Sequence, residues 1–520
     1  MTISATTISA TTISLDAEFG LIADLVRQTA RQAPDRIAVI DGERRLSYRA
    51  FDDLVDRVAA SLQRDGVGPR ETIAICAASS LEYVATFLGA LRAGVVVAPL
   101  APGSTPASLA AMARDGAARL LFLDAATQGV LGEIDAGVRR IALDGAAHGV
   151  AFQDWLAPAG ARPTPVAIEP DWVFNTIYSS GTTGTPKGIE QPHAMRWSHV
   201  QRAALFEYGP DAVTIVSTPL YSNTTLVSVF PTLALGGALA LMAKFEARAF
   251  LTLAQKHRAT HAMLVPVQYS RIMALPDFDA YDLSNFKMKF STSAPFAAEL
   301  KRDVLRRWPG GLVEYYGMTE GGGTCILAAH LFPDKLHTVG QPAEGHEILL
   351  LDEEGRQVRA GEIGEVAGRS AGMMNGYRNQ PGKTREAEWF DAEGRRFIRT
   401  GDVGRFDEDG FLVLMDRRKD MIISGGFNVY PSDIEAVLKE RPEIAEASVV
   451  GVPSPEWGET PIAFVSLKPD AALDPDELRA WANARLGKTQ RLSGVRLIDA
   501  LPRSAIGKVL KRELREMWAG

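Results

Sequence analysis

From about residue 38 onward, short apolar segments alternate with segments in which apolar residues recur every three or four positions. Several of the apolar segments have the length and composition of buried strands: IAVID, TIAICA, VVVAPL and RLLFLD. One segment between them places its apolar residues on a single helical face: Phe51, Leu54, Val55, Val58, Ala59 and Leu62. This alternation predicts a layered α/β architecture with largely parallel sheets, and a second stretch of the same kind runs from about residue 172 to 320.

After about residue 330 the pattern changes to short strands separated by turn residues. The segment HEILLLDEEGRQVRAGEIGEVAGR contains Glu-Gly and Ala-Gly turns between apolar runs, which is typical of a small β-rich subdomain. A further change comes at LMDRRKDMIISGG, residues 414–426, where consecutive basic residues favour a linker over a core segment. The residues that follow this linker are predicted to form a separate small α+β unit.

Helix starts are predicted at two places in this C-terminal unit. Ser432 is followed by Glu435 three positions later, which is the spacing of a capping box. Asp474 precedes a proline and is followed by Glu477, a combination typical of a first helical turn.

The chain opens with MTISATTISATTIS, which repeats the pentamer Thr-Ile-Ser-Ala-Thr and lacks the basic start and apolar centre of a signal peptide. Its low complexity predicts a disordered tail over residues 1–16. The chain is therefore expected to consist of this tail, a large domain over 17–416 and a small mobile domain over 417–520.

Composition places the chain among ordinary globular proteins, with 46% apolar and 23% charged residues over 520 positions. A net charge of -7 argues against nucleic-acid binding, because a phosphate backbone demands a basic surface. Cys76 and Cys325 favour free thiols in a reducing cytoplasm over a disulfide framework. No apolar run approaches the ~20 residues of a membrane span, so we expect a cytoplasmic protein. The sequence leaves monomer and homodimer open.

The stretch YSSGTTGTPKG, residues 178–188, has the composition of a loop that wraps an anion. Its glycines allow backbone N–H groups to face a phosphate, and its hydroxyl side chains add donors. Lys187 supplies a positive charge. The stretch is not a Walker loop, because no Gly-Lys-Ser/Thr follows the required gap. A flexible polar loop between a strand and a helix would explain the same composition.

Further motifs accompany this loop in order: YYGMTE (315–320), TGD (400–402), DRRKDMIISGGFNVYP (416–431) and PRSAIGKVLKREL (502–514). Together they resemble the motifs of the adenylate-forming superfamily, which comprises acyl-CoA synthetases, nonribosomal peptide adenylation domains and beetle luciferases. The resemblance extends from about residue 20 to the C-terminus. It implies two half-reactions. A carboxylate attacks the α-phosphorus of ATP to give an acyl-adenylate and pyrophosphate, and a thiol, usually that of coenzyme A, then displaces AMP.

The resemblance assigns the nucleotide site to these residues: Ser179, Ser180, Gly181, Thr182, Thr183, Gly184, Lys187, Tyr316, Gly317, Thr319, Asp402 and Arg417. Thr319 is implied to donate to the α-phosphate and Glu320 to hold Mg²⁺, a hard cation that takes oxygen ligands. Tyr316 is implied to lie against the adenine and Asp402 to accept both ribose hydroxyls. Arg417 is implied to reach the ribose or the phosphates. Without the resemblance, Thr319 and Glu320 would also suit the first turn of a helix.

Lys508, in SAIGKVL, matches the family lysine that reaches from the small domain to the carboxylate and the α-phosphate oxygens. A cation in that position offsets the repulsion between the two reacting anions. The resemblance places the pivot of a domain rotation at Lys419. It also implies that Gly425 and Gly426 line a pantetheine tunnel, where the absence of a side chain leaves room. A tight hairpin turn is the alternative for this glycine pair.

The predicted acyl pocket departs from the family pattern. Many relatives carry Pro-Leu-Phe/Tyr-His beside the pocket, whereas this chain has PLYSNTT, with Ser222 in the histidine position. No charged residue stands there to pair an α-amino group, so an α-amino acid substrate is not expected. An uncharged aliphatic or aromatic monocarboxylic acid is predicted instead. The predicted pocket residues are Tyr221, Ser222, Asn223, Ser293, Ala294 and Met318.

The predicted function is that of an acid–thiol ligase that uses ATP, Mg²⁺ and coenzyme A. A ligase that loads the acid onto an acyl carrier protein would share the same residues, so both acceptors stay open. A non-catalytic nucleotide- or acyl-binding relative is disfavoured, because Lys508, Glu320 and Asp402 are all present.

Overall fold

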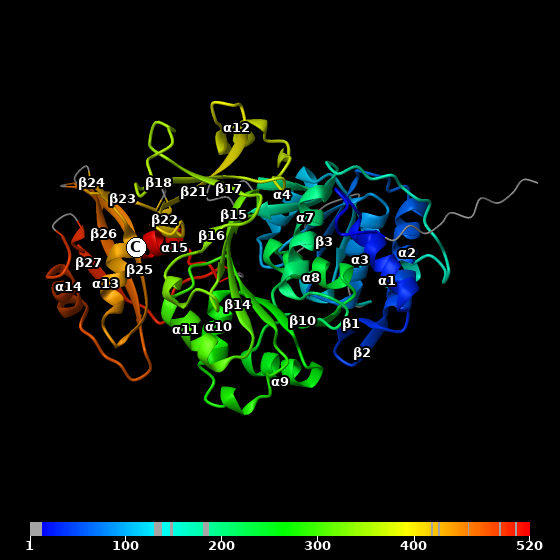
Figure 1. Ribbon diagram of the computed structural model, residues 1–520, viewed down its shortest axis with the longest axis horizontal. Coiled ribbons are helices and arrows are strands. Elements are labelled where there is room, and N and C mark those ends of the chain that lie inside the picture. Colours follow the sequence, from blue (N-terminus) through cyan, green and yellow to red (C-terminus); the bar gives the residue numbers. More distant parts are fainter. Residues whose placement is uncertain are drawn as a thin grey trace, which may run out of the picture.

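The computed structural model describes residues 13–128, 138–145, 149–179, 187–417, 420–424, 427–455, 457–487, 490–504 and 507–519. Figure 1 shows a large part built from the segments before about residue 417 and a smaller part, built from the C-terminal segment, at one end of the molecule. The strands of the described residues form four sheets, one of them in the smaller part.

One sheet of the large part contains nine strands, among them β14. From edge to edge its strands are β16 (Gln341–Pro342), β15 (Gly321–Ala328), β14 (Gly311–Met318), β13 (Met288–Ser291), β12 (His261–Leu264), β10 (Val213–Val216), β11 (Ala238–Leu241), β1 (Ile37–Asp41) and β2 (Arg44–Ser47). The pairings from β14 to β1 are parallel, whereas those at the two edges are antiparallel.

A second sheet of the large part has the same mixed character. Its strands are β19 (Gly376–Tyr377), β9 (Lys187–Pro192), β8 (Val173–Ser179), β4 (Val96–Pro99), β3 (Thr72–Cys76), β5 (Ala118–Leu123), β6 (Arg139–Ala142) and β7 (Val150–Ala151). The strands expected from the apolar segments are thus confirmed as β1, β3, β4 and β5, and the expected parallel pairing is found between β8 and β7 along this sheet.

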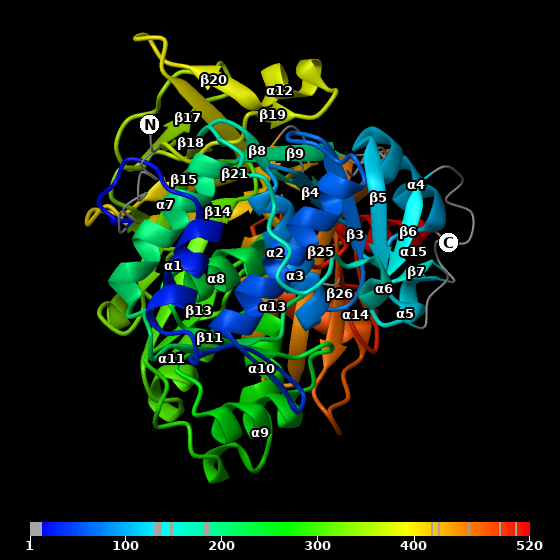
Figure 2. The same ribbon diagram turned by 90° about the vertical axis from the view of Figure 1, so that its right-hand side faces the viewer.

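Helices lie between and around these two sheets. They are α1 (Ile22–Gln32), α2 (Tyr48–Arg64), α3 (Leu81–Arg92), α4 (Pro106–Asp115), α5 (Ala125–Gln128), α6 (Phe152–Trp155), α7 (His193–Ala203), α8 (Asn223–Ala234), α9 (Ala247–His257), α10 (Pro266–Met273), α11 (Ala298–Arg307) and α12 (Pro381–Ala387). Residues of α1, α2, α3 and α8 share one buried apolar cluster with residues of strands from both sheets, so these helices fill the layer between the sheets (Figure 2).

The predicted helical stripe is confirmed in α2. Ser47 caps the helix by accepting a hydrogen bond from the Ala50 N–H at 3.4 Å. All residues of the stripe are buried except Leu54, which is partly exposed and packs against the same cluster. Gly89 of α3 faces Val58 so closely that a side chain at position 89 would overlap it, which allows α2 and α3 to lie side by side.

The β-rich subdomain and the C-terminal α+β unit are both found. The first comprises β17 (Glu347–Leu351), β18 (Gly364–Arg369), β20 (Glu388–Phe390), β21 (Arg396–Phe406) and β22 (Leu412–Arg417). The second comprises β23 (Ile422–Ser424), β24 (Phe427–Val429), α13 (Pro431–Lys439), β25 (Ile444–Ser454), β26 (Gly458–Leu467), α14 (Pro475–Asn483), β27 (Gly494–Leu497) and α15 (Lys511–Ala519). Asp474 caps α14 by accepting from the N–H groups of Asp476 and Glu477, as predicted.

Two local predictions need correction. The predicted tail over 1–16 is too long, because Ile13 and Leu15 pack against the core cluster and the Leu15 carbonyl accepts from Gln201 Nε2 at 2.8 Å. Ser432 does not cap a helix, because α13 already begins at Pro431. Its partner Glu435 instead accepts from the Val449 N–H at 2.8 Å and so ties α13 to β25.

Cys76 and Cys325 are free and buried, as predicted for thiols outside a disulfide framework. Burial raises the pKa of each thiol to about 12, so both stay protonated at neutral pH. Over the described part of the chain, no helix is long and apolar enough to cross a membrane.

Candidate active site

A cavity of about 2260 Å³ lies where the β14–β15 hairpin, α8, the β-rich subdomain and the C-terminal unit meet. The structure brings a large set of the predicted site residues together on its lining: Lys187, Tyr221, Ser222, Asn223, Ser293, Ala294, Tyr316, Gly317, Met318, Thr319, Glu320, Asp402 and Lys508. They come from segments that are far apart in the sequence. Their individual roles stay predictions.

Some predicted positions lie outside the described residues: Ser180, Gly181, Thr182, Thr183, Gly184, Lys419, Gly425 and Gly426. Ser179 is the last residue of β8, and Arg417 is the last residue of β22, where it pairs with Asp402 of β21.

Thr319 and Glu320 form the turn of the hairpin between β14 and β15. The alternative assignment of these residues to the first turn of a helix is therefore wrong. Gly321 follows with a φ of 80° and lies against the Gly372 carbonyl, a position in which a side chain would be both strained and obstructed. The turn is held from below, because Gln191 Nε2 donates to the Thr319 carbonyl at 2.6 Å.

Glu320 is tied to the end of the predicted phosphate loop through Tyr377. The Tyr377 hydroxyl donates to Glu320 Oε1 at 2.8 Å, and the ammonium of Lys187 lies 5.1 Å from the centre of the Tyr377 ring. Burial and the Glu320 carboxylate raise the pKa of Tyr377 well above its usual value, so its hydroxyl remains a donor. The sequence did not single out Tyr377, which comes from an edge strand rather than from a recognised motif.

Tyr316 and Asp402 are in direct contact. The Tyr316 hydroxyl donates to Asp402 Oδ2 at 2.8 Å and lies 3.3 Å from Thr400 Oγ1. Thr400 Oγ1 in turn donates to the Val366 carbonyl at 2.9 Å and accepts from the Asp402 N–H at 3.0 Å. Burial raises the pKa of Tyr316 far above its usual value, so the tyrosine fixes the carboxylate as a neutral donor.

Beneath the hairpin turn lies a buried polar group that the sequence did not reveal. Arg196, which is 1% exposed, donates from Nη2 to Asn175 Oδ1 at 3.0 Å and also to Gln191 Oε1. Gln191 Nε2 then donates both to the Thr319 carbonyl at 2.6 Å and to Asn223 Oδ1 at 3.1 Å. Burial lowers the pKa of Arg196 to about 9, which still leaves it charged at neutral pH. This group connects the hairpin turn to the start of α8.

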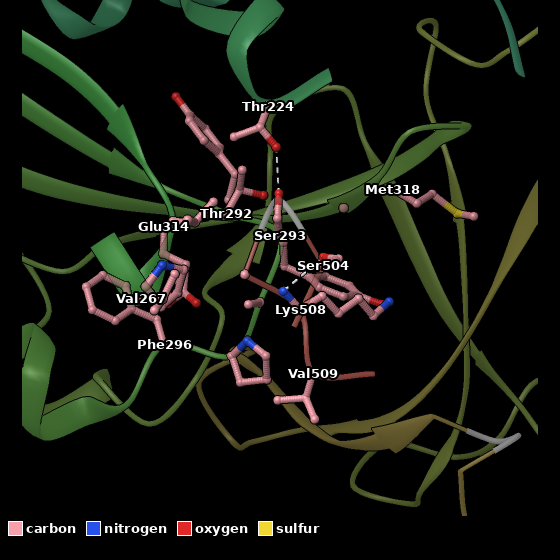
Figure 3. Close-up of a pocket in the computed structure, with 18 of the residues that line it drawn as sticks. Thr224, Val267, Thr292, Ser293, Phe296, Glu314, Met318, Ser504, Lys508 and Val509 are labelled. Atoms are coloured by element: carbon pink, nitrogen blue, oxygen red, sulfur yellow. Dashed lines mark hydrogen bonds between the residues drawn. The ribbon is translucent and has the colours of Figure 1, made fainter. Parts of the chain in front are cut away.

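Lys508 enters the cavity on a compact turn of the C-terminal unit (Figure 3). The Ser504 N–H donates to the Lys508 carbonyl at 2.8 Å, and the Lys508 N–H donates to Ser504 Oγ at 3.2 Å. Gly507 has a φ of 77°, and a Cβ added there would lie 2.7 Å from Val267 Cγ1 of α10. The turn therefore packs directly against the large part, and only glycine fits at position 507.

The predicted acyl pocket is lined by hydroxyl groups in contact with one another. Thr224 Oγ1 lies 2.6 Å from Ser293 Oγ (Figure 3), and Ser293 has a φ of 78°, which is unusual for a residue other than glycine. Ser222 is buried directly before α8, and Asn223 is its first residue. Burial raises the pKa of Tyr221, so no charged group arises from these residues at neutral pH.

Three basic side chains that the sequence did not reveal also line the cavity. His199 and Arg202 come from α7, and His346 precedes β17. Arg202 Nη2 lies 2.9 Å from His346 Nε2 across 144 positions of sequence. Only a prediction of that long-range contact could have identified the group.

Comparison with known proteins places the chain in a family. The model of AMP-binding enzymes matches residues 26–378, and that of the AMP-binding enzyme C-terminal domain matches residues 433–508. The chain is 32% identical over 502 residues to the 4-coumarate–CoA ligase 2 of Nicotiana tabacum, covering 93% of this chain and 92% of the relative. It is 30% identical over 503 residues to the fatty acid–[acyl-carrier-protein] ligase ScoC of Streptomyces coeruleorubidus, covering 94% and 95%. The solved structure of ATP-bound MatB from Rhodopseudomonas palustris matches with a TM-score of 0.85 at 28% identity, covering 95% of this chain and 99% of that one.

The chain belongs to the AMP-binding enzymes, the adenylate-forming superfamily, and is homologous to CoA ligases over nearly its full length. By this homology it is an AMP-forming acid–thiol ligase of the acyl-CoA synthetase family. The predicted fold class is confirmed: a large part with layered sheets and a small C-terminal domain.

Proposed function

We propose that this enzyme activates a carboxylic acid with ATP and then transfers the acyl group to the thiol of coenzyme A. One observation supports the proposal above the others. Lys508 of the C-terminal unit lines the same cavity as Asp402 and Glu320, which are expected at the nucleotide, and as Thr224 and Ser293 of the expected acid pocket. One cavity thus holds a cation together with the residues expected to bind both reacting anions.

In the first half-reaction, a carboxylate oxygen forms a bond to the α-phosphorus of ATP while the bond to the β-phosphate oxygen breaks, and pyrophosphate leaves. Both reactants are anions, so Lys508 lowers the barrier by neutralising charge where they meet. Tyr316 holds the Asp402 carboxylate toward the ribose, and Gln191 fixes the backbone at Thr319. These residues act by position, since none of them needs to exchange a proton.

Glu320 suits the Mg²⁺ ion that the family implies. Its carboxylate lines the cavity and is oriented by the Tyr377 hydroxyl at 2.8 Å, and carboxylate oxygens are the ligands that this hard cation prefers. Mg²⁺ commonly takes one or two protein carboxylates and completes its shell with water and substrate phosphates, so a single glutamate is sufficient. When bound, the ion would supply further neutralisation of the phosphate charge.

In the second half-reaction, the thiol attacks the acyl carbonyl carbon, the bond to the phosphate oxygen breaks and AMP leaves. We propose that the C-terminal unit turns about Lys419 between the two steps and that Gly425 and Gly426 then line the pantetheine path. A bulky residue at Gly425 should spare pyrophosphate release and abolish thioester formation. Equal loss of both steps in Gly425→Leu would contradict the tunnel.

The acceptor has one serious alternative. The similarity to the ligase ScoC supports transfer to an acyl carrier protein, whose arm presents the same thiol. The decisive experiment offers a panel of carboxylic acids with ATP, measures pyrophosphate release, and then compares thioester yield with free coenzyme A and with carrier proteins. Coenzyme A is expected to be the better acceptor. Absence of pyrophosphate release with every acid would overturn the proposed activity itself.

A further inference from the structure

The basic side chains of His199, Arg202 and His346 line the cavity without an acidic partner among the described residues. The contact of the Arg202 guanidinium is with the ring of His346, and no described carboxylate forms an ion pair with it. Burial lowers the pKa of Arg202 from its usual value, while the nearby Tyr315 stays a neutral phenol because burial raises its pKa. Arg202 is partly buried, and a partly buried cation without a counter-charge favours a partner from outside the chain.

His346 cannot serve as that partner for Arg202. A neutral imidazole has one acceptor nitrogen, and two N–H groups point at this ring. The Thr324 backbone N–H donates to Nδ1 at 3.0 Å, and Arg202 Nη2 lies 2.9 Å from Nε2. Burial and the charge of Arg202 lower the pKa of His346 to about 4, so the ring is neutral at physiological pH. The ring can therefore accept from only one of these two N–H groups, and as a neutral group it does not balance the charge of Arg202.

The groups that surround His199 are also basic. Its Nδ1 is buried and has no hydrogen-bond partner within the described residues. Burial lowers the pKa of His199 well below its usual value, and the charges that act on it, from Arg196, Arg202 and His346, lower it further. Every titratable group that acts on this histidine is basic. The positive charge in this part of the lining is therefore that of Arg202, and no acidic group of the described residues acts on the neighbouring His199.

Aromatic side chains line the same cavity beside this basic group. Tyr208, Phe290 and Tyr315 line the cavity with their rings stacked in sequence at centroid distances of 5.7 Å for each pair. Tyr315, beside Arg202, precedes Met318, the last residue of β14, by three residues, a separation of about 10 Å at the rise of a strand. A ligand that reached both ends would carry polar groups at its two ends and an apolar segment between them.

We propose that the acid activated by this enzyme carries a second carboxylate, separated from the reacting one by an apolar spacer, and that Arg202 binds this second carboxylate. The guanidinium offers a planar pair of donors that matches a carboxylate. The inference rests on the proposed function and replaces the expectation of a monocarboxylic acid, which the sequence favoured because the expected pocket residues are mostly small or apolar with scattered hydroxyls.

The test compares acids of matched length on the purified full-length enzyme. Pyrophosphate release is measured with linear dicarboxylic acids from succinic to dodecanedioic acid, and with the monocarboxylic and ω-hydroxy acids of the same carbon number. The wild type is expected to have its highest kcat/KM with one of the longer dicarboxylic acids. A monocarboxylic or ω-hydroxy acid that equals or exceeds the best dicarboxylic acid would overturn the proposal.

Variants then connect the preference to the side chain. Arg202→Met keeps the length of the side chain, removes its charge and should lower kcat/KM for the best dicarboxylic acid by ~10²-fold, as expected when one partner of a buried charge pair is lost. The kcat/KM for the monocarboxylic acid should not fall, because that acid has no group to pair with Arg202. Arg202→Lys, which keeps the charge, should retain part of the preference. The exposed Arg45→Met serves as the matched control and should behave as the wild type.

A binding readout keeps this inference separate from the activity. Each dicarboxylic acid of the panel is also added alone, and at least one should raise the unfolding temperature of the wild type and of Arg45→Met without raising that of Arg202→Met. If no acid supports pyrophosphate release, the proposed function fails, whereas this Arg202-dependent shift would still reveal the subsite. If the acid preference and the shift are the same in Arg202→Met as in the wild type, the subsite is refuted even though the ligase activity stands.

Discussion

Neighbouring residues of β14 contact two halves of the cavity that differ in how their polar groups are bonded. Tyr316 contacts Asp402 in the half that we assign to the nucleotide, whereas its neighbour Tyr315 stacks on Phe290 in the half that we assign to the acid. In the nucleotide half the polar groups bond to each other through Tyr316, Thr400 and Tyr377. In the acid half, Arg202 Nη2 lies 2.9 Å from His346 Nε2 and has no carboxylate partner among the described residues.

This difference indicates how each half prepares for its ligand. ATP is common to the whole family, so its half can be organised in advance by internal hydrogen bonds, which saves reorganisation when the ligand arrives. The acid differs among relatives, and its half keeps a charge that only a fitting ligand satisfies. Specificity then follows from the cost of leaving that charge unpaired when the wrong acid binds.

The largest effect is expected when the cation of Lys508 is removed. In Lys508→Ala, acyl-adenylate formation should fall by ~10²–10³-fold, because charge stabilisation at the reacting oxygens is lost. Conversion of preformed acyl-adenylate to thioester should be unchanged. Pyrophosphate release and thioester yield measure the two steps. Lys511→Ala is the control, because Lys511 lies 3.5 Å from Glu435 outside the turn, and an equal loss there would refute a specific role for Lys508.

A smaller effect is expected when the organisation of the nucleotide half is broken. Asp402→Asn loses a charged acceptor for the Tyr316 hydroxyl and for the ribose, and hydrogen bonds to charged groups contribute ~1.5–3 kcal/mol, or about 10–100-fold in KM for ATP. KM for the acid should stay constant. Tyr316→Phe, which leaves the carboxylate in place, should give a weaker effect of the same kind. An unchanged KM for ATP in Asp402→Asn would remove Asp402 from the nucleotide site.

A still smaller effect is expected from substitution of Gln191, which belongs to the buried polar group beneath the hairpin turn. Gln191→Leu removes the bonds to the Thr319 carbonyl and to Asn223, and each lost bond to a buried group costs ~1–3 kcal/mol. Part of that cost should appear as a lower unfolding temperature and part as a drop of about tenfold in kcat with little change in either KM. Gln191→Glu, which cannot donate to the Thr319 carbonyl, should not restore kcat. A loss of stability alone would show a merely structural role.

The smallest change concerns the hydroxyl pair of the acid half. Thr224→Val removes the contact with Ser293 at 2.6 Å and should alter KM for the acid by about threefold to tenfold, the equivalent of one neutral hydrogen bond. KM for ATP should not change. Ser293→Ala removes the other member of the pair and keeps the backbone conformation, so it should match Thr224→Val. If KM for ATP changed as much as KM for the acid, the division of the cavity into halves would be wrong.

Much of the fold could be predicted because it follows from local patterns. The apolar segments became β1, β3, β4 and β5, and the stripe from Phe51 to Leu62 became the buried face of α2. The predicted start of α13 was wrong, because Ser432 and Glu435 have the spacing of a capping box but do not form one. Glu435 instead accepts a hydrogen bond from the Val449 N–H of β25. Tertiary packing overrode a local signal at that position.

The residues of the candidate site also fall into those that local patterns predict and those that they do not. Tyr316, Thr319, Asp402 and Lys508 could be located because motifs carry them at fixed spacings. Arg202 could not, since an arginine near the end of an amphipathic helix is typical of a solvated surface, and its partner His346 is 144 positions away. Polar groups that owe their role to long-range packing leave no periodic signal in the sequence.

The turn that bears Lys508 has one more consequence. Ser504 donates to the Lys508 carbonyl and its hydroxyl accepts from the Lys508 N–H, both within the C-terminal unit, whereas Gly507 lies against Val267 of the large part. Under the proposed rotation, the lysine would leave the cavity together with Ser504, and Gly507 would lose its contact with Val267. Acyl-adenylate formation would then be possible only while this glycine lies against the valine.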